Sequence, residues 1–352
     1  MDSPWQRELS VAIAAVQQAS KLSQAVLAEQ DKGILEKDDL SPVTVADFAI
    51  QALLTATIHH SFPHDGFVGE ESGDDLRANP ALLQRVWALL QRFSPDCAPP
   101  SPCRIPSGPD EVCDMVDWCG HGLPLQPQKP RVWVFDPIDG TKTFIRGQMY
   151  AVNVALLHDG EQVLSTVALP LLPLDATPPV TDATSDPAGQ GTIVFAAKGY
   201  GTHVRPLRGA LSDVAVRRVP PILADHPDQL RPVSSLLARA SAIDEVHAAA
   251  AARLGITLPG CDLLGWVPRW VVLALGLANM TFWVYRSRTR YAKLWDHAGA
   301  LLLFQEVGGK VTDVQGRDIN LGAGRKLTDN YGFVAAPAPL HATVLAAVQD
   351  SL

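Results

Sequence analysis

The chain has 352 residues, a formal net charge of −8, 47% hydrophobic residues and 19% charged residues. This composition excludes an intrinsically disordered protein, because apolar side chains are abundant and charged ones are few. The excess of acidic over basic residues argues against binding of a nucleic-acid polymer through its phosphates. At about 150 residues per domain, the length predicts roughly two lobes. We place them at residues 1–175 and 190–352.

The chain begins with Met-Asp-Ser-Pro, has no apolar segment at its N-terminus and contains five cysteines, an odd number. These features favour a reduced, cytoplasmic protein. The longest apolar stretch, residues 263–285, contains a proline, an arginine, a glycine and an asparagine. We therefore interpret it as a buried helix and strand, and we expect no contact with a membrane.

The first half of the chain is predicted to mix helices with a sheet. Apolar residues at helical spacing predict helices, and alternating or continuous apolar runs predict strands. The expected helices are 5–30, 48–60 and a short one at 111–118, and the expected strands are 67–71, 131–135, 150–158 and 162–169. Asp159-Gly160 joins the last two strands and is typical of a hairpin turn. Residues 94–130, rich in Pro, Gly and Cys, are expected to form an irregular surface excursion.

The second half follows a loop rich in Pro, Thr and Asp at residues 171–190, which we interpret as the boundary between the lobes. After this loop the same patterns continue. The expected strands are 192–198, 203–206, 214–219 and 310–313, and the expected helices are 236–254, 271–278, 296–307 and 341–349. Such an alternation is compatible with stacked layers of helices and sheets.

Acidic residues recur at the ends of predicted strands or at the starts of predicted helices. They are Asp47, Glu70, Asp136, Asp139 and Asp296. Oxygen ligands without Cys or His suit Mg²⁺ rather than Zn²⁺. The amides of Gly140 and Thr141, directly after Asp139, can point toward an anion such as a phosphate. Each acid taken alone is also compatible with a turn or a helix cap. Together they suggest metal-assisted phosphoryl chemistry.

The motifs Asp136-Pro-Ile-Asp-Gly-Thr141, Trp295-Asp-His-Ala-Gly299 and Gly69-Glu-Glu-Ser72 all stand in the chain. With them, the chain resembles the inositol monophosphatase superfamily of Mg²⁺-dependent, lithium-sensitive phosphomonoesterases. Within the superfamily it is most similar to the 3′(2′),5′-bisphosphate nucleotidase branch, through the segments 37–47, 140–148, 273–278 and 293–297. The resemblance implies an α-β-α-β-α sandwich of mixed α/β class, with most metal ligands in the first lobe.

The resemblance also implies roles for individual residues. Glu70, Asp136 and the carbonyl of Ile138 would bind one Mg²⁺, and Asp136, Asp139 and Asp296 would bind a second. Glu70 would be able to hold a third, looser ion. Asp47 and Thr141 would orient and activate the attacking water, and Gly140 and Thr141 would contact the phosphate. We therefore expect two to three Mg²⁺ ions as cofactors.

The substrate-binding run of the branch, Asp-Ser-Gln-x-Lys-Tyr, is replaced here by Gly265-Trp-Val-Pro-Arg-Trp270. Arg269 can supply the charge of the lysine, although arginine and lysine differ in geometry. Trp266 stands where a serine is expected. Arg288, in a run of alternating arginines between Tyr285 and Tyr291, is a candidate for binding a second phosphate. The same run is also compatible with an exposed strand.

The resemblance implies a phosphomonoesterase that removes the 3′-phosphate of adenosine 3′,5′-bisphosphate, leaves AMP and is inhibited by lithium. The implied partner is thus a small phosphoester. One alternative is a phosphatase of the same fold that acts on an inositol phosphate or another specialised phosphoester, because the substrate-binding run differs. The other is a regulatory protein without catalysis. The retained acids argue against it, because carboxylates that repel one another at one point serve no purpose without a metal.

Overall fold

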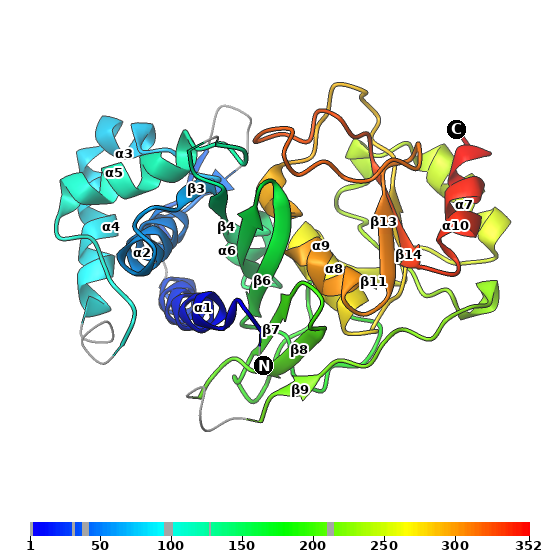
Figure 1. Cartoon of the computed structure of the whole chain (residues 1–352), viewed down its shortest axis with the longest axis horizontal. Helices are drawn as coiled ribbons and strands as arrows, with labels where there is room; N and C mark the ends of the chain where they lie inside the picture. Colours follow the sequence, from blue (N-terminus) through cyan, green and yellow to red (C-terminus); the bar gives the residue numbers. More distant parts are fainter. Residues whose placement is uncertain (1–2, 30–31, 37–41, 95–100, 127, 210–214) are drawn as a thin grey trace.

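The computed structural model of the chain describes residues 3–29, 32–36, 42–94, 101–126, 128–209 and 215–352. Figure 1 shows its layers from left to right: N-terminal helices, a large sheet, a central pair of helices, a small sheet and two further helices. This is the predicted α-β-α-β-α sandwich. Buried apolar side chains form two clusters, one on each face of the large sheet.

The first layer consists of α1 (Gln6–Leu27), α2 (Val45–Ser61), α3 (Asp74–Ala78), α4 (Pro80–Arg92) and α5 (Pro109–Gly120). The structure confirms the first two predicted helices. The short helix predicted at 111–118 is confirmed as α5, which is slightly longer than expected, buries Val112, Met115 and Val116 and packs against α2. The excursion at 94–130 is therefore irregular only in part. Residues 37–41 of the segment 37–47, which contributes to the resemblance, lie outside the described residues. Cys97 also lies outside them.

The large sheet has seven strands in the order of the chain: β3 (Gly66–Gly69), β4 (Arg131–Asp139), β5 (Ala151–His158), β6 (Glu161–Leu169), β7 (Thr192–Ala197), β8 (Thr202–Pro206) and β9 (Arg217–Arg218). Within this sheet, β3 and β4 pair in parallel and the later neighbours pair antiparallel. The predicted hairpin is confirmed, with φ of 51° at Asp159 and 81° at Gly160. Because β7 pairs with β6, the sheet runs through the predicted lobe boundary at 171–190.

The central layer consists of α8 (Trp266–Ala274) and α9 (Ala300–Gln305), which pack against each other and against the large sheet. The apolar stretch 263–285 forms α8 and the strand β12 (Thr281–Trp283), as expected. Pro268 lies in the first turn of α8, where a missing N–H is tolerated. The described part of the chain holds no helix long and apolar enough to cross a membrane.

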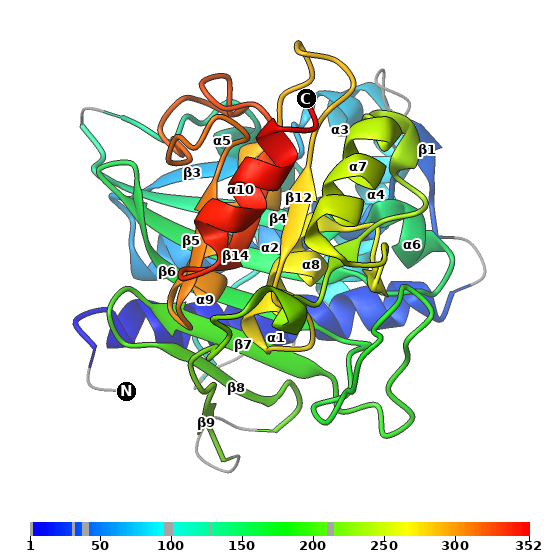
Figure 2. The same cartoon turned by 90° about the vertical axis from the view of Figure 1, so that its right-hand side faces the viewer.

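The small sheet, β12, β14 (Phe333–Pro337) and β13 (Gly309–Thr312), is covered on its outer face by α7 (Asp244–Leu254) and α10 (His341–Gln349), as Figure 2 shows. Short elements complete the fold: α6 (Thr141–Ile145), the pairs β1 (Leu35–Glu36) with β2 (Pro42–Val43) and β10 (Val233–Ser234) with β11 (Cys261–Asp262), and 3-10 turns at Pro227–Gln229, Arg239–Ser241 and Leu294–Asp296. The helix expected at 236–254 begins only at Asp244.

Candidate active site

Strand β4 delivers two buried carboxylates to one side of the sheet. Residues three positions apart on a regular strand face opposite sides. Here the three steps from Asp136 to Asp139 stand opposite only two steps of β5, from Asn153 to Ala151. This bulge inserts one extra residue and turns both carboxylates toward the same centre. The Asp-Pro-Ile-Asp sequence is thus part of the strand, rather than a turn that follows it.

Glu70 follows the end of β3, and two side chains from distant elements hold the backbone around it. The amide of Gln51, on α2, donates to the carbonyl of Glu71 at 2.7 Å and accepts from its N–H at 2.9 Å. The guanidinium of Arg325 donates to the carbonyl of Gly69 at 2.6 Å. Sequence reasoning missed both residues, because no local pattern links them to Glu70.

Asp296 ends a 3-10 turn beside β5, and Asn153 holds that turn. The buried amide of Asn153 donates to the carbonyls of Trp295 and Ala298 at 2.8 and 3.0 Å. Asn153 stands opposite Asp136 in the register of the sheet. Asn153 therefore connects the strand position opposite Asp136 to the turn that carries Asp296. Asn153 is a third residue that no sequence pattern selects.

Asp136, Asp139 and Asp296 offer carboxylate oxygens that all lie within 4.8 Å of one another. Burial raises the pKa of Asp136 and of Asp296 well above the usual range, and the charges of Glu70 and Asp139 add to both shifts. Burial raises the pKa of Asp139 to about 7, against the opposing effect of a hydrogen bond from the Val267 N–H. The carboxylates therefore repel one another, which is the electrostatic condition of a cation site.

The second half of the chain closes over Asp139. Its Oδ2 accepts the N–H of Val267 at 2.8 Å, so the carboxylate caps the N-terminus of α8. A Cβ on Gly265 would clash with the same oxygen. Glycine at position 265 therefore lets the start of α8 approach the carboxylate directly.

Asp47 and Thr141 lie at the starts of two helices beside the carboxylates. Asp47 is fully buried in the first turn of α2, where its Oδ2 accepts the N–H and the hydroxyl of Thr44 at 2.7 and 2.6 Å. Its charge also contributes to the raised pKa of Asp136, after burial and the nearer acids. The hydroxyl of Thr141 donates to the carbonyl of Ile138 at 3.2 Å. Among the described residues, the carboxylate group within 4.8 Å contains Asp136, Asp139 and Asp296, while Glu70 and Thr141 line the adjoining cavity.

The residues fit a hard divalent cation. The ligand set is made of oxygens, which Mg²⁺ prefers. Asp136 is 1% exposed, and its buried Oδ1 has no hydrogen-bond partner among the described residues. A buried carboxylate oxygen without a partner is costly unless a cation or a proton satisfies it. The carboxylates are therefore positioned to hold a metal ion.

A cavity of about 560 Å³ opens from this centre. Its lining includes the acids Glu70, Asp139 and Asp296 and the residues at the start of α6, Gly140, Thr141 and Lys142. Basic and aromatic residues complete the wall; they include Trp266, Trp283, Tyr285, Arg290, Tyr291, Lys293 and Lys326. The cavity thus joins a metal-binding end to a cationic wall, an arrangement suited to a phosphorylated small molecule.

Two predicted substrate contacts are placed differently from expectation. Arg269 borders the cavity but is only 1% exposed, with its guanidinium 4.3 Å from the ring centre of Trp266 and 4.8 Å from that of Trp283. Its Nε and Nη2 donate to the carbonyls of Leu263 and Leu264. Arg269 therefore contributes positive charge to the cavity from a buried position and does not present its guanidinium at the cavity surface.

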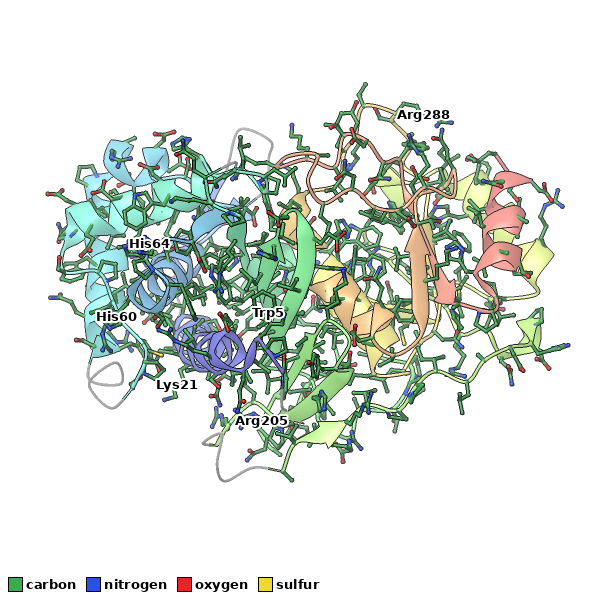
Figure 3. The ribbon with its side chains drawn as sticks, viewed as in Figure 1. Trp5, Lys21, His60, His64, Arg205 and Arg288 are labelled. Carbon is green, nitrogen blue, oxygen red and sulfur yellow. The ribbon has the colours of Figure 1, made fainter. Side chains whose placement is uncertain are left out.

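Arg288 lies on the outer surface, as Figure 3 shows, with its guanidinium 4.1 Å from the ring centre of Tyr331. Among the described residues that line the cavity, Arg290 is present and Arg288 is not. Segment 286–290 forms an exposed turn rather than a strand. The alternation of a strand therefore does not indicate which of its arginines faces the cavity. Arg290 replaces Arg288 as the candidate contact.

The chain matches a family model and is similar in sequence to named fungal proteins. The family model described as "Inositol monophosphatase family" matches residues 5–352. A 3′(2′),5′-bisphosphate nucleotidase of Emericella nidulans is 35% identical and covers 99% of both chains, and one of Schizosaccharomyces pombe is 32% identical, covering 94% of this chain and 91% of its own.

Solved structures with the same fold include the IMPase of Thermotoga maritima, with a TM-score of 0.59 at 16% identity, covering 98% of each chain. Inositol monophosphatase II of Staphylococcus aureus has a TM-score of 0.57 at 16% identity, covering 95% of this chain and 92% of its own. At such identities the likeness concerns the fold alone. The family match and the fungal relatives are more specific, and they show that the chain belongs to the inositol monophosphatase family.

Proposed function

We propose that this protein is a Mg²⁺-dependent phosphomonoesterase of the 3′(2′),5′-bisphosphate nucleotidase type, which converts adenosine 3′,5′-bisphosphate and water into AMP and inorganic phosphate. The observation that carries the proposal is the buried cluster of Asp136, Asp139 and Asp296 at the end of a cavity with a cationic wall. Relatives with that name match this chain over almost its whole length.

The chain's residues divide the work of metal binding and substrate binding. Two Mg²⁺ ions would be held by Glu70, Asp136, Asp139, Asp296 and the carbonyl of Ile138, and Glu70 would be available for a third. When bound, the ions supply Lewis-acid polarisation of the phosphate and stabilisation of the leaving oxygen. The amides at the start of α6, at Gly140 and Thr141, receive phosphate oxygens.

Asp47 and Thr141 act on the water. The hydroxyl of Thr141 orients the attacking water. A proton of this water passes toward the carboxylate of Asp47. The new bond joins the water oxygen to phosphorus, and the bond from phosphorus to the 3′ oxygen breaks. The leaving oxygen takes a proton from solvent, and Asp47 returns the proton that it received to solvent. Arg290, Lys293 and Lys326 face the same cavity and neutralise the second phosphate of the substrate.

Phosphate release is the direct test. The wild type is assayed with Mg²⁺ on adenosine 3′,5′-bisphosphate, with inositol 1,4-bisphosphate and AMP in parallel and with the Asp139→Asn variant as the blank. We expect fast release from the nucleotide bisphosphate, inhibited by lithium. Mg²⁺ binding with no release from this substrate would refute the proposed substrate.

A second candidate is a phosphatase of the same fold with another substrate, such as an inositol phosphate. The observation in its favour is the wall formed by the replaced run 265–270. There the guanidinium of Arg269 packs against the indole rings of Trp266 and Trp283, which are nearly perpendicular to each other, and within this run only Trp266 is partly exposed. The parallel assay separates the candidates, because release from inositol 1,4-bisphosphate alone selects the second.

The proposal includes a small-molecule partner and a cytoplasmic location. The net charge of −8 disfavours a nucleic-acid polymer as substrate. The four described cysteines are all buried free thiols, as in a reducing compartment. Fluorescence microscopy of the tagged protein together with cell fractionation tests the location.

A further inference from the structure

Arg325 joins three segments that meet at the metal-binding end of the cavity. It lies in the segment between β13 and β14, which extends over the molecule to the ends of β3 and α5 in Figures 1 and 2. There its Nη1 donates to the carbonyl of Cys119 at 2.7 Å and its Nη2 to the carbonyl of Gly69 at 2.6 Å, with a longer contact of 3.4 Å to the carbonyl of Glu70. The planar guanidinium thus binds the backbone that carries Glu70 through hydrogen bonds to carbonyls.

The same residue also holds the segment that leads to Asp296. The carbonyl of Arg325 accepts the N–H of Leu294 at 3.0 Å, and its guanidinium lies 4.9 Å from the ring centre of Trp295. Asp296 is the next residue in the chain. One arginine therefore contacts the backbone beside Glu70 and the 3-10 turn that ends in Asp296, although these two acids are more than two hundred residues apart.

The other supports of the centre do not make this connection. Gln51 binds the backbone of Glu71 and Val116, which both lie in the first half of the chain. Asn153 binds the turn of Asp296 to the large sheet. Among the described contacts of Gln51, Asn153 and Arg325, only those of Arg325 connect the backbone beside Glu70 to the turn that carries Asp296.

We propose that Arg325 is a positioning residue that sets the separation of Glu70 and Asp296 and thereby tunes the affinity of the centre for Mg²⁺. The inference rests on the proposed function, because it takes these two acids as ligands of the same metal centre. Arg325 acts through backbone carbonyls and an indole ring, so its effect falls on the affinity for the metal. Residues that orient metal ligands without touching the metal typically change affinity by about 10- to 100-fold.

The primary test is calorimetric titration of the metal-free protein with Mg²⁺, without substrate. We expect Arg325→Ala to bind Mg²⁺ about 10- to 100-fold more weakly than the wild type. We also expect the Mg²⁺ concentration for half-maximal phosphate release to rise, while the rate at saturating Mg²⁺ changes much less. Arg325→Lys should recover part of the affinity, because one ammonium group keeps the charge but cannot bridge two carbonyls as the guanidinium does.

The matched control is Arg317→Ala in the same segment. Arg317 is half-exposed and binds the buried carboxylate of Asp313 at 2.9 Å, away from the centre. This variant weakens the segment without touching Glu70 or Trp295. We expect a lower melting temperature with unchanged Mg²⁺ binding. If the control loses affinity as Arg325→Ala does, general loosening explains the effect and the proposal fails.

A double-mutant cycle with Glu70→Gln tests whether Arg325 acts through Glu70. In the Glu70→Gln background, Arg325→Lys should change Mg²⁺ affinity far less than in the wild type. Equal effects in both backgrounds would overturn the proposal, as would wild-type affinity in Arg325→Ala. Either result leaves the proposed function standing if the wild type binds Mg²⁺ and hydrolyses its substrate. A wild type that binds no Mg²⁺ would overturn both.

Discussion

The surroundings of Asp139 act on its pKa in opposite directions. The N–H of Val267 favours its charged form, whereas burial disfavours it and raises its pKa to about 7. Asp139→Asn keeps an oxygen that can accept the N–H of Val267 and removes the charge. We expect phosphate release to fall by more than about 100-fold, because a metal ligand is lost. Without metal, the melting temperature of the variant at pH 8 should equal or exceed that of the wild type.

Differential scanning calorimetry and the phosphate assay, run on the same preparation, check both parts. An active Asp139→Asn variant would contradict the assignment of the metal site. An inactive variant with a strongly reduced melting temperature would show that Asp139 serves the fold more than the chemistry.

The acids of the site could be predicted from the sequence, and their supports could not. Asp136 and Asp139 stand in a recognisable motif at the end of an apolar strand, and the bulge that aligns them appears only in the pairing with β5. Gln51 and Arg325 act on residues 20 and more than 200 positions away. A single glutamine in a helix or arginine in a loop carries no local signal of such a contact.

At the scale of the element, helix α9 depends on the glycine that precedes it. Gly299 has a φ of 81°, and a Cβ there would lie 2.6 Å from the Cβ of Ala155 on β5. Gly299→Ala therefore forces a strained backbone and a clash with the large sheet. We expect a loss of about 1 to 3 kcal/mol in the free energy of unfolding, measured by urea denaturation.

Gly276, which follows α8, gives the control. Its φ is 73°, and a Cβ added there would meet no heavy atom of the described residues within 4 Å. Gly276→Ala carries the backbone strain without the clash. If both variants lose the same stability, the close approach of α9 to β5 contributes nothing. A larger loss in Gly299→Ala supports the packing argument.

The connection between β6 and β7 holds the start of α8 through Asp182. Both carboxylate oxygens of Asp182 accept the N–H of Leu264 at 3.1 Å, and burial raises the pKa of Asp182 to about 6. A raised pKa in the folded state means that protonation favours folding, and this contribution is lost as the pH rises through about 6. Asp182→Asn removes the titration and keeps one acceptor oxygen.

The melting temperature of Asp182→Asn minus that of the wild type should therefore become more positive between about pH 5 and pH 7.5. Thermal unfolding in matched buffers measures this difference, and groups common to both proteins cancel. A difference that is constant across this range would contradict the raised pKa of Asp182.

Periodicity predicted most elements, and its failures have tertiary causes. Residues 236–254 are rich in Ala and Leu and predict one α-helix, but the α-helix covers only Asp244–Leu254 and is preceded by a 3-10 turn at Arg239–Ser241. The N–H of Ile243 donates to the carbonyl of Val284, and Ala242 forms a bridge with Tyr285. Backbone pairing with the segment after β12 therefore replaces the first turns of the expected helix.

At the scale of the whole molecule, the acids of the centre couple stability to pH and to metal. The pKa values of Asp136, Asp139 and Asp296 are all raised in the folded protein, by burial first and by one another's charges or that of Glu70 next. Their protonated forms favour folding, so the metal-free protein loses stability as the pH rises through these values, about 7 for Asp139. Bound Mg²⁺ offsets the repulsion and stabilises the native state by mass action.

We expect the melting temperature without metal to fall between about pH 6 and pH 8.5, and the increase caused by millimolar Mg²⁺ to grow over the same range. Thermal unfolding with and without Mg²⁺ checks this, with Ca²⁺ as a test of selectivity. A Mg²⁺ effect that shrinks as the pH rises would contradict the raised pKa values of the centre.

The large sheet also has a consequence for the order in which the protein is made. Its last strand ends at Arg218, whereas α8 and α9, which cover its second face, end at Ala274 and Gln305. At about 5 to 20 residues per second, the ribosome needs roughly 4 to 17 seconds to add the intervening segment. Side chains such as Val132 and Val134, which are buried in the finished protein, have no helical layer to cover them until this segment has been made. The layer that covers the second face of the sheet is therefore made after the sheet itself, and Asp296 of the carboxylate cluster is made with that layer.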